Sequence, residues 1–149
     1  MLPARTLLNP PPVGDLLAEL AAFRQRVERL LADEAADWQR RPAEAEWSLT
    51  EIACHLRDVE DDGAFLPGVD ADAWAAERNY RAQDGRAAAA AFVAARAETI
   101  ARLTPLPLDL WDTQGQHTFF GPTSLHELVY LAVQHDRVHG QQIDQLRRA

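Results

Sequence analysis

Two histidines four residues apart form the pattern with the clearest chemical meaning in this sequence. His135 and His139 lie in the last long stretch in which apolar residues recur at helical spacing. On an α-helix their side chains project about 40° apart and one turn along, so both imidazoles can reach the same ion. The sequence therefore predicts that these two residues are ligands of one metal ion.

The same projection places both histidines in the middle of the apolar stripe of this segment. Gln142 lies on that face too, and His126 projects about 180° away, which predicts a surface position outside the site. An unpaired buried polar group costs roughly 1–3 kcal/mol, and a shared ion satisfies two of these three groups at once. The alternative is two core histidines hydrogen-bonded to the backbone or to Gln142. The apolar residues that project within about 60° of His135 are Leu128, Leu131, Ala132, Val138 and Leu146.

His55, in an earlier helical stretch, is the candidate for the third ligand. Val59 and Ile52 project on one side of it, and the carboxylates of Glu51 and Asp58 flank it on the other. These two acids are the candidates for a catalytic base. Three neutral nitrogen ligands leave a position open for water or substrate, as in catalytic sites, and they suit zinc, nickel, copper or iron.

Four long helices are expected to position these residues. Ser48-x-x-Glu51 and Ser124-x-x-Glu127 are capping boxes that mark where two of the helices begin. Four amphipathic helices in 149 residues predict an all-α four-helix bundle that forms a single domain over residues 1–149. The expected bounds are about Asp15 to Asp33, Ser48 to Gly63, Asp84 to Leu103 and Ser124 to Leu146, with a short helix at 72–79 and a long loop at 105–122.

Composition excludes several classes of protein. The net charge is −8 with no basic patch, which argues against nucleic acid as a partner. All 15 basic residues are arginine, so P-loop and lysine Schiff-base chemistry are excluded. The single Cys54 precludes an intramolecular disulfide and agrees with a reducing compartment. Without a signal-peptide pattern or an apolar run of about 20 residues, we expect a cytoplasmic protein with no membrane partner.

Arg96 occupies a core-facing position of the third helix, on the same face as Phe92 and Ile100. One role for it is a salt bridge to an acid of the second helix. The other is to anchor a substrate carboxylate through two hydrogen bonds. Arg96 and Gln142 are therefore the candidate substrate-binding residues.

The sequence resembles the DinB/YfiT-like superfamily of metal-binding helical bundles over nearly its whole length. The matching segments occur in the order found in that family, and the three-histidine set is the most specific of them. They are Trp47-Ser48-Leu49-Thr50-Glu51-Ile52, His55-Leu56-Arg57-Asp58-Val59-Glu60, Phe92-x-x-x-Arg96, Gly121-Pro122-x-Ser124-Leu125 and His135-Asp136-x-x-His139-x-x-Gln142-Ile143.

This resemblance implies an up-down-down-up bundle, a homodimer, and one divalent ion, zinc or nickel, held by His55, His135 and His139. Some relatives are transferases that join a low-molecular-weight thiol to an electrophile, and others are described only as metal-dependent hydrolases. The leading hypothesis is a thiol S-transferase acting on a small-molecule substrate. The alternatives are a hydrolase that uses metal-activated water and a metal-stabilised bundle without catalysis, related to stress.

Overall fold

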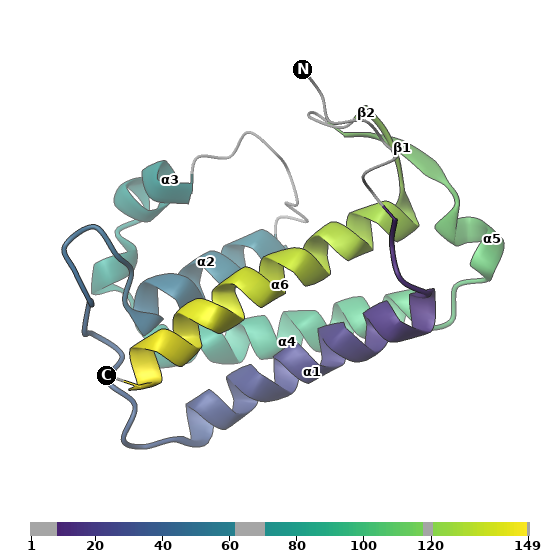
Figure 1. Cartoon of the computed structure of the whole chain (residues 1–149). Coiled ribbons are helices and arrows are strands. Elements are labelled where there is room, and N and C mark those ends of the chain that lie inside the picture. The colour runs from purple at the N-terminus through teal and green to yellow at the C-terminus, as the bar shows by residue number, and fades with distance from the viewer. Residues whose placement is uncertain (1–8, 62–70, 118–120, 149) are drawn as a thin grey trace.

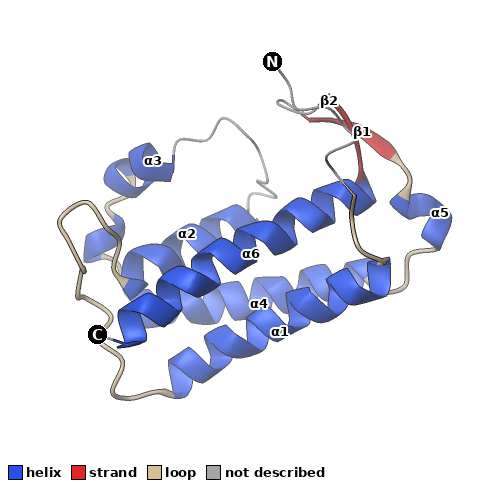
Figure 2. Ribbon diagram, in the orientation of Figure 1, coloured by secondary structure: helices blue, strands red, loops and turns tan. Residues whose placement is uncertain are grey.

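The computed structural model describes residues 9–61, 71–117 and 121–148, and four long helices dominate it (Figures 1 and 2). They are α1 (Val13–Ala32), α2 (Leu49–Asp61), α4 (Gly85–Leu103) and α6 (Leu125–Arg148). The shorter elements are α3 (Ala71–Glu77), the 3-10 turn η2 (Tyr80–Ala82), α5 (Leu108–Trp111), β1 (Gln114–His117) and β2 (Gly121–Ser124). The predicted four-helix bundle is confirmed. Among the described helices, none combines the length and the hydrophobicity needed to cross a membrane.

Capping boxes fix the first residue of both helices that carry histidines. The backbone N–H of Glu51 donates to the Ser48 hydroxyl at 3.3 Å, and the backbone N–H of Ser48 donates to Glu51 Oε1 at 3.1 Å. Ser124 and Glu127 make the same reciprocal pair, with both bonds at 3.0 Å. Each cap satisfies N–H groups that the first turn of a helix leaves without a partner. Both predicted caps are confirmed.

Helices α2 and α4 are parallel, although they are consecutive long helices in the chain (Figure 1). Gly85, the first residue of α4, lies so close to Thr50 at the start of α2 that an added Cβ atom would overlap it. Further along, Arg96 of α4 pairs with Glu60 near the end of α2. Parallel neighbours need a long return connection, and the chain between α2 and α4 supplies it.

Helices α1 and α6 are the second parallel pair. Arg137 of α6 donates to Glu19 of α1, and ten residues later Arg147 donates to Asp33 at the end of α1. Both helices therefore advance in the same direction. α1 is antiparallel to α4, since Arg24 donates to the backbone oxygen of Val93, whereas Arg86 at the start of α4 donates to that of Leu31 near the end of α1. The direction of the four helices is therefore up-down-down-up, as the resemblance implied.

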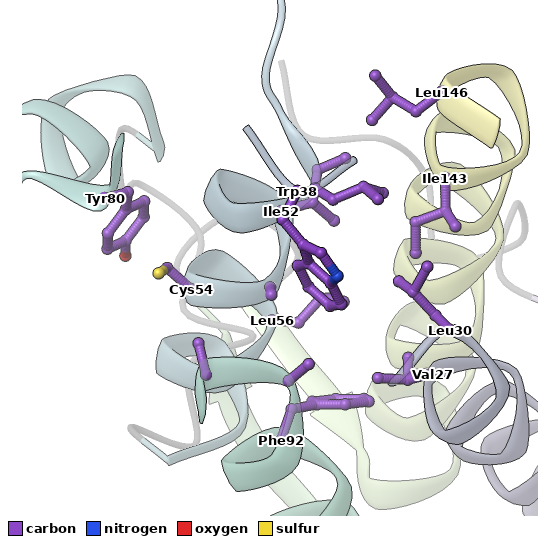
Figure 3. Packing of buried hydrophobic residues seen from close by; sticks show 14 of the residues in the cluster. Val27, Leu30, Trp38, Ile52, Cys54, Leu56, Tyr80, Phe92, Ile143 and Leu146 are labelled. Atoms are coloured by element: carbon purple, nitrogen blue, oxygen red, sulfur yellow. The ribbon is translucent and has the colours of Figure 1, made fainter. Parts of the chain in front are cut away.

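Two groups of buried side chains form the core. The larger group lies between α1, α2, α4 and the C-terminal half of α6, where Leu30, Leu56 and Ile143 lie near the indole of Trp38 (Figure 3). The smaller group packs Trp111 of α5 against Leu16 and Leu20 of α1 and against Val133 of α6. Trp111 thus anchors the segment that follows α4 to the far end of the bundle.

The segment expected to be a loop at 105–122 contains α5 and a two-stranded hairpin instead. β1 and β2 are antiparallel, with Gln114 opposite Ser124 and His117 opposite Gly121. Gly121 has a φ of 68°, a backbone conformation that glycine adopts without strain. The sequence did not predict these strands because they lack the alternation of apolar and polar residues that marks a half-buried strand.

One buried arginine connects all four long helices. Arg96 of α4 donates two hydrogen bonds to Glu60 of α2 and two to Asp136 of α6. A fifth bond, at 3.4 Å, goes to the backbone oxygen of Leu20 in α1. A guanidinium has five N–H groups, so every donor of Arg96 is used. Its side chain is only 2% exposed, and the bonds hold the bundle in one arrangement.

Replacing Arg96 by leucine should lower the free energy of unfolding by about 3–5 kcal/mol, because two carboxylates would stay buried without a partner. The control is Arg102→Leu on the same helix, whose i,i+4 pair with Glu98 is 77% and 64% exposed. That variant should change stability by no more than about 0.5 kcal/mol. Urea denaturation of both variants measures the difference. Equal midpoints for the two would contradict the central role of Arg96.

Candidate metal centre

Three histidine side chains meet between α2 and α6. The Nε2 atom of His135 lies 2.9 Å from Nε2 of His55 and 3.1 Å from Nε2 of His139. His55 and His139 are buried, and His135 is half-buried. The predicted convergence of these three residues is confirmed, while metal binding itself stays a prediction. Across residues 9–61, 71–117 and 121–148, no carboxylate oxygen or thiol joins the cluster.

The separation of the three nitrogens fits ligands of one ion. With metal–nitrogen distances of about 2.0–2.1 Å, two ligands of a tetrahedral or octahedral ion lie roughly 2.9–3.4 Å apart. Direct hydrogen bonds do not explain the cluster as well, since a proton on His135 Nε2 can serve only one of its two neighbours. A cation at the centre would satisfy all three lone pairs at once.

The electrostatic environment keeps these rings neutral, which is the form that binds metals. Burial lowers the pKa of His55 to about 4, and the neighbouring His139 contributes in the same direction. Burial also lowers the pKa of His135 to about 3, again with His139 as the next cause. The pKa of His139 is lowered by burial as well, although its bond to Gln142 opposes the shift. At neutral pH all three imidazoles are therefore uncharged, and each can offer a nitrogen lone pair to a metal ion.

The groups behind the three ligands differ. Nδ1 of His139 lies 2.6 Å from Oε1 of Gln142, which is the contact between Gln142 and a core histidine that the sequence offered as one alternative. Nδ1 of His55 is buried and has no hydrogen-bond partner within the described residues. The ring of Trp47 packs against His55, with 5.3 Å between ring centroids. Trp47 precedes the cap of α2, which is why it reaches a side chain two turns along.

Helix α6 is rotated relative to the orientation that its apolar pattern predicted. Val138, expected in the buried stripe, is 56% exposed, whereas the charged Asp136 is buried. Asp136 takes the buried position because Arg96 supplies it with two hydrogen bonds. His135 therefore lies at the edge of the buried face, next to His55 of α2, and not at its centre.

The two candidate bases are occupied by other partners. Both oxygens of Glu51 accept bonds from Arg41, and Oε1 also bonds to Ser48. Burial would raise the pKa of Glu51, but the bonds to Arg41 and Ser48 outweigh it and hold the pKa below its usual value. Glu51 is thus committed to capping α2 and to an ion pair, which corrects its proposed role as a base.

Asp58 is committed in the same way. Its oxygens accept bonds from Arg57, Arg78 and Tyr80. Burial works to raise the pKa of Asp58, but these three bonds prevail and lower it. A carboxylate with several donors and a depressed pKa takes up protons poorly, so the structure speaks against Asp58 as a base as well.

Two further expectations are corrected by the packing. Arg96 makes the salt bridge to the second helix that was one of its two predicted roles, and it has no donor left for a substrate carboxylate. His126 lies outside the histidine cluster, as predicted, but it is half-buried and not a free surface residue. Its Nε2 atom bonds to the backbone oxygen of Pro11 at 2.6 Å, and its ring meets Trp111 edge-on.

Comparisons with known proteins identify the family of the chain and support its fold. The sequence matches the DinB superfamily over residues 20–143. The chain belongs to the DinB superfamily. Among solved structures it is similar to YfiT from Bacillus subtilis, described as a probable metal-dependent hydrolase with an unusual four-helix bundle topology. That match has a TM-score of 0.76 at 16% identity and covers 91% of this chain and 85% of YfiT. No curated protein sequence is significantly similar to the chain.

If the DinB-type cluster holds an ion, His135→Ala should abolish its retention. We expect the natively purified protein to carry about one divalent ion per chain. The variant should carry almost none, because the Nε2 atom of His135 lies next to those of both His55 and His139 and the remaining two ligands would not hold the ion. Elemental analysis by mass spectrometry measures the content. His126→Ala, on the same helix and outside the cluster, is the matched control and should keep its metal. Equal metal content in all three proteins would contradict the site.

Stability of the metal-free protein should fall as the pH drops from about 7 to about 4. Unfolded histidines take up protons near pH 6.5, whereas folded His55 and His135 stay neutral until about pH 4 and about pH 3. The unfolded state therefore binds more protons in this window. Each of these two histidines lowers the free energy of unfolding by about 1.4 kcal/mol for each pH unit of acidification. Chemical denaturation in the presence of a chelator measures the slope. A His135→Gln variant should show a shallower slope, and an unchanged slope would contradict this assignment.

Proposed function

We propose that this DinB superfamily protein is a metal-dependent transferase that joins a low-molecular-weight thiol to an electrophilic substrate. The observation that supports this most is the composition of the cluster: three neutral imidazole nitrogens converge, and no described carboxylate or thiol joins them as a ligand. Zinc or nickel suits such a donor set. Of the two reactions considered, thiol transfer has the smaller need for a protein base, because a bound ion favours the thiolate directly.

The bound ion would supply positive charge that favours the thiolate form of a cosubstrate at neutral pH. The three histidines contribute by staying neutral, because burial depresses the pKa of each of them. His135 is half-buried whereas the other two are buried, so an incoming molecule would approach the ion from the side of His135. On the other side of the cluster, His55 is buried and its ring packs against Trp47.

The overall reaction balances without a protein nucleophile. The thiol proton passes to solvent, the sulfur forms a bond to an electrophilic carbon, and the leaving group departs with the electron pair of the bond that breaks. No residue of the chain changes its covalent state in this scheme. Glu51, Asp58 and Arg96 act as parts of the scaffold, since their hydrogen-bonding groups are committed to other side chains.

Hydrolysis is the second candidate, because the similar protein YfiT is described as a probable metal-dependent hydrolase. The same ion would then activate water. A hydrolase of this type would have to work without Glu51 or Asp58 as its base, given the partners of both acids. This requirement makes hydrolysis the less favoured of the two.

An assay with paired substrates tests the proposal. The zinc-loaded and nickel-loaded proteins are mixed with glutathione, mycothiol or bacillithiol and a chromogenic aryl halide. We expect adduct formation above the uncatalysed rate with at least one thiol, abolished in His135→Ala and kept in His126→Ala. Turnover of ester or amide substrates without any thiol would favour hydrolysis. Absence of both reactions from the metal-loaded protein would overturn the enzymatic assignment.

A further inference from the structure

Gln142 contacts the imidazole ring of one of the three candidate ligands, His139. It follows His139 by three residues on α6, so the two side chains lie on the same face of the helix. Oε1 of Gln142 is 2.6 Å from Nδ1 of His139, and Nε2 of the same ring faces His135. An amide oxygen only accepts hydrogen bonds. The hydrogen of the neutral His139 ring is therefore on Nδ1, and the lone pair is on Nε2, within the cluster.

The opposite arrangement would block the site. Had the amide of Gln142 presented its NH₂ group, it would donate to Nδ1 and force the ring hydrogen onto Nε2. That hydrogen would then point at His135 and occupy the place of an ion. The end of the amide that meets His139 thus decides whether this ring can bind a metal.

The other buried ligand has no such support within the described residues. Nδ1 of His55 is fully buried and makes no hydrogen bond there, and the ring is held by packing against Trp47. Among the residues that the structure describes, no hydrogen bond to Nδ1 selects between the two neutral forms of His55. The contrast assigns a specific role to Gln142, because the hydrogen bond is present at one ligand and absent at another.

We propose that Gln142 is a positioning residue that fixes the metal-binding tautomer and the ring orientation of His139. The inference rests on the metal centre of the proposed function, and it replaces the expected contact of Gln142 with substrate. Loss of an outer hydrogen-bond partner of a ligating histidine typically costs about 10–100-fold in metal affinity. We expect a loss of that size when the acceptor is removed.

Three variants separate positioning from general effects on the helix. Gln142→Leu removes the acceptor at similar size, and Gln142→Glu keeps an acceptor oxygen at the same place. Gln141→Leu makes the same chemical change at the adjacent, exposed position. Zinc affinity is measured by competition with a chromophoric chelator at neutral pH, and thermal unfolding of each metal-free protein checks the fold.

The expected result is zinc binding weaker by about 10–100-fold in Gln142→Leu, with Gln142→Glu rescued to wild-type affinity or tighter and Gln141→Leu unchanged. Equal affinity of Gln142→Leu and wild type would overturn the inference while leaving the metal centre intact. A wild-type protein that binds no zinc would instead refute the proposed function.

The tautomer can be observed without any metal. ¹⁵N NMR of the imidazoles in the metal-free protein distinguishes the ring with hydrogen on Nδ1 from the ring with hydrogen on Nε2. His139 should be in the Nδ1–H form in the wild type and in Gln141→Leu, and it should become a mixture in Gln142→Leu. A wild-type His139 with its hydrogen on Nε2, or an unchanged spectrum in Gln142→Leu, would refute the role of Gln142 whatever the outcome with zinc.

Discussion

The structure depends on the burial of one positive charge at the point where four helices meet. Taking an arginine out of water is costly, and the cost is offset only if its geometry with acidic partners is good and every donor is satisfied. Arg96 meets this condition with Glu60, Asp136 and the Leu20 carbonyl, which belong to the three other helices. Shifting any one helix along its axis would break part of this set, so the pairing selects one register for the bundle.

This constraint reaches the histidine cluster through sequence adjacency. Asp136 is next to His135, so the bonds that draw Asp136 toward α4 also set the rotation of α6. That rotation turns His135 and His139 toward α2, where the cap at Ser48 fixes the position of His55. The cluster is therefore the product of two independent anchors, a buried ion pair on one side and a helix cap on the other.

The parts of the fold that were predictable are those that local chemistry determines. The two capping boxes located the starts of α2 and α6, and the four-residue spacing of His135 and His139 predicted that they share a face. The rotation of α6 was not predictable, because a hydrophobic pattern cannot reveal that Asp136 has a partner on another helix. The same reason hid the commitment of Glu51, whose partner Arg41 lies in a connection without regular structure.

The histidine cluster joins segments that are far apart in the chain, since His55 and His135 are separated by 80 positions. An ion shared by them would act as a reversible cross-link that closes a very large loop. Such a cross-link lowers the entropy of the unfolded chain by an amount that grows with the logarithm of loop length. The folded state is stabilised as a result. Occupancy of the cluster would therefore govern how firmly the C-terminal helix is tied to the first half of the protein.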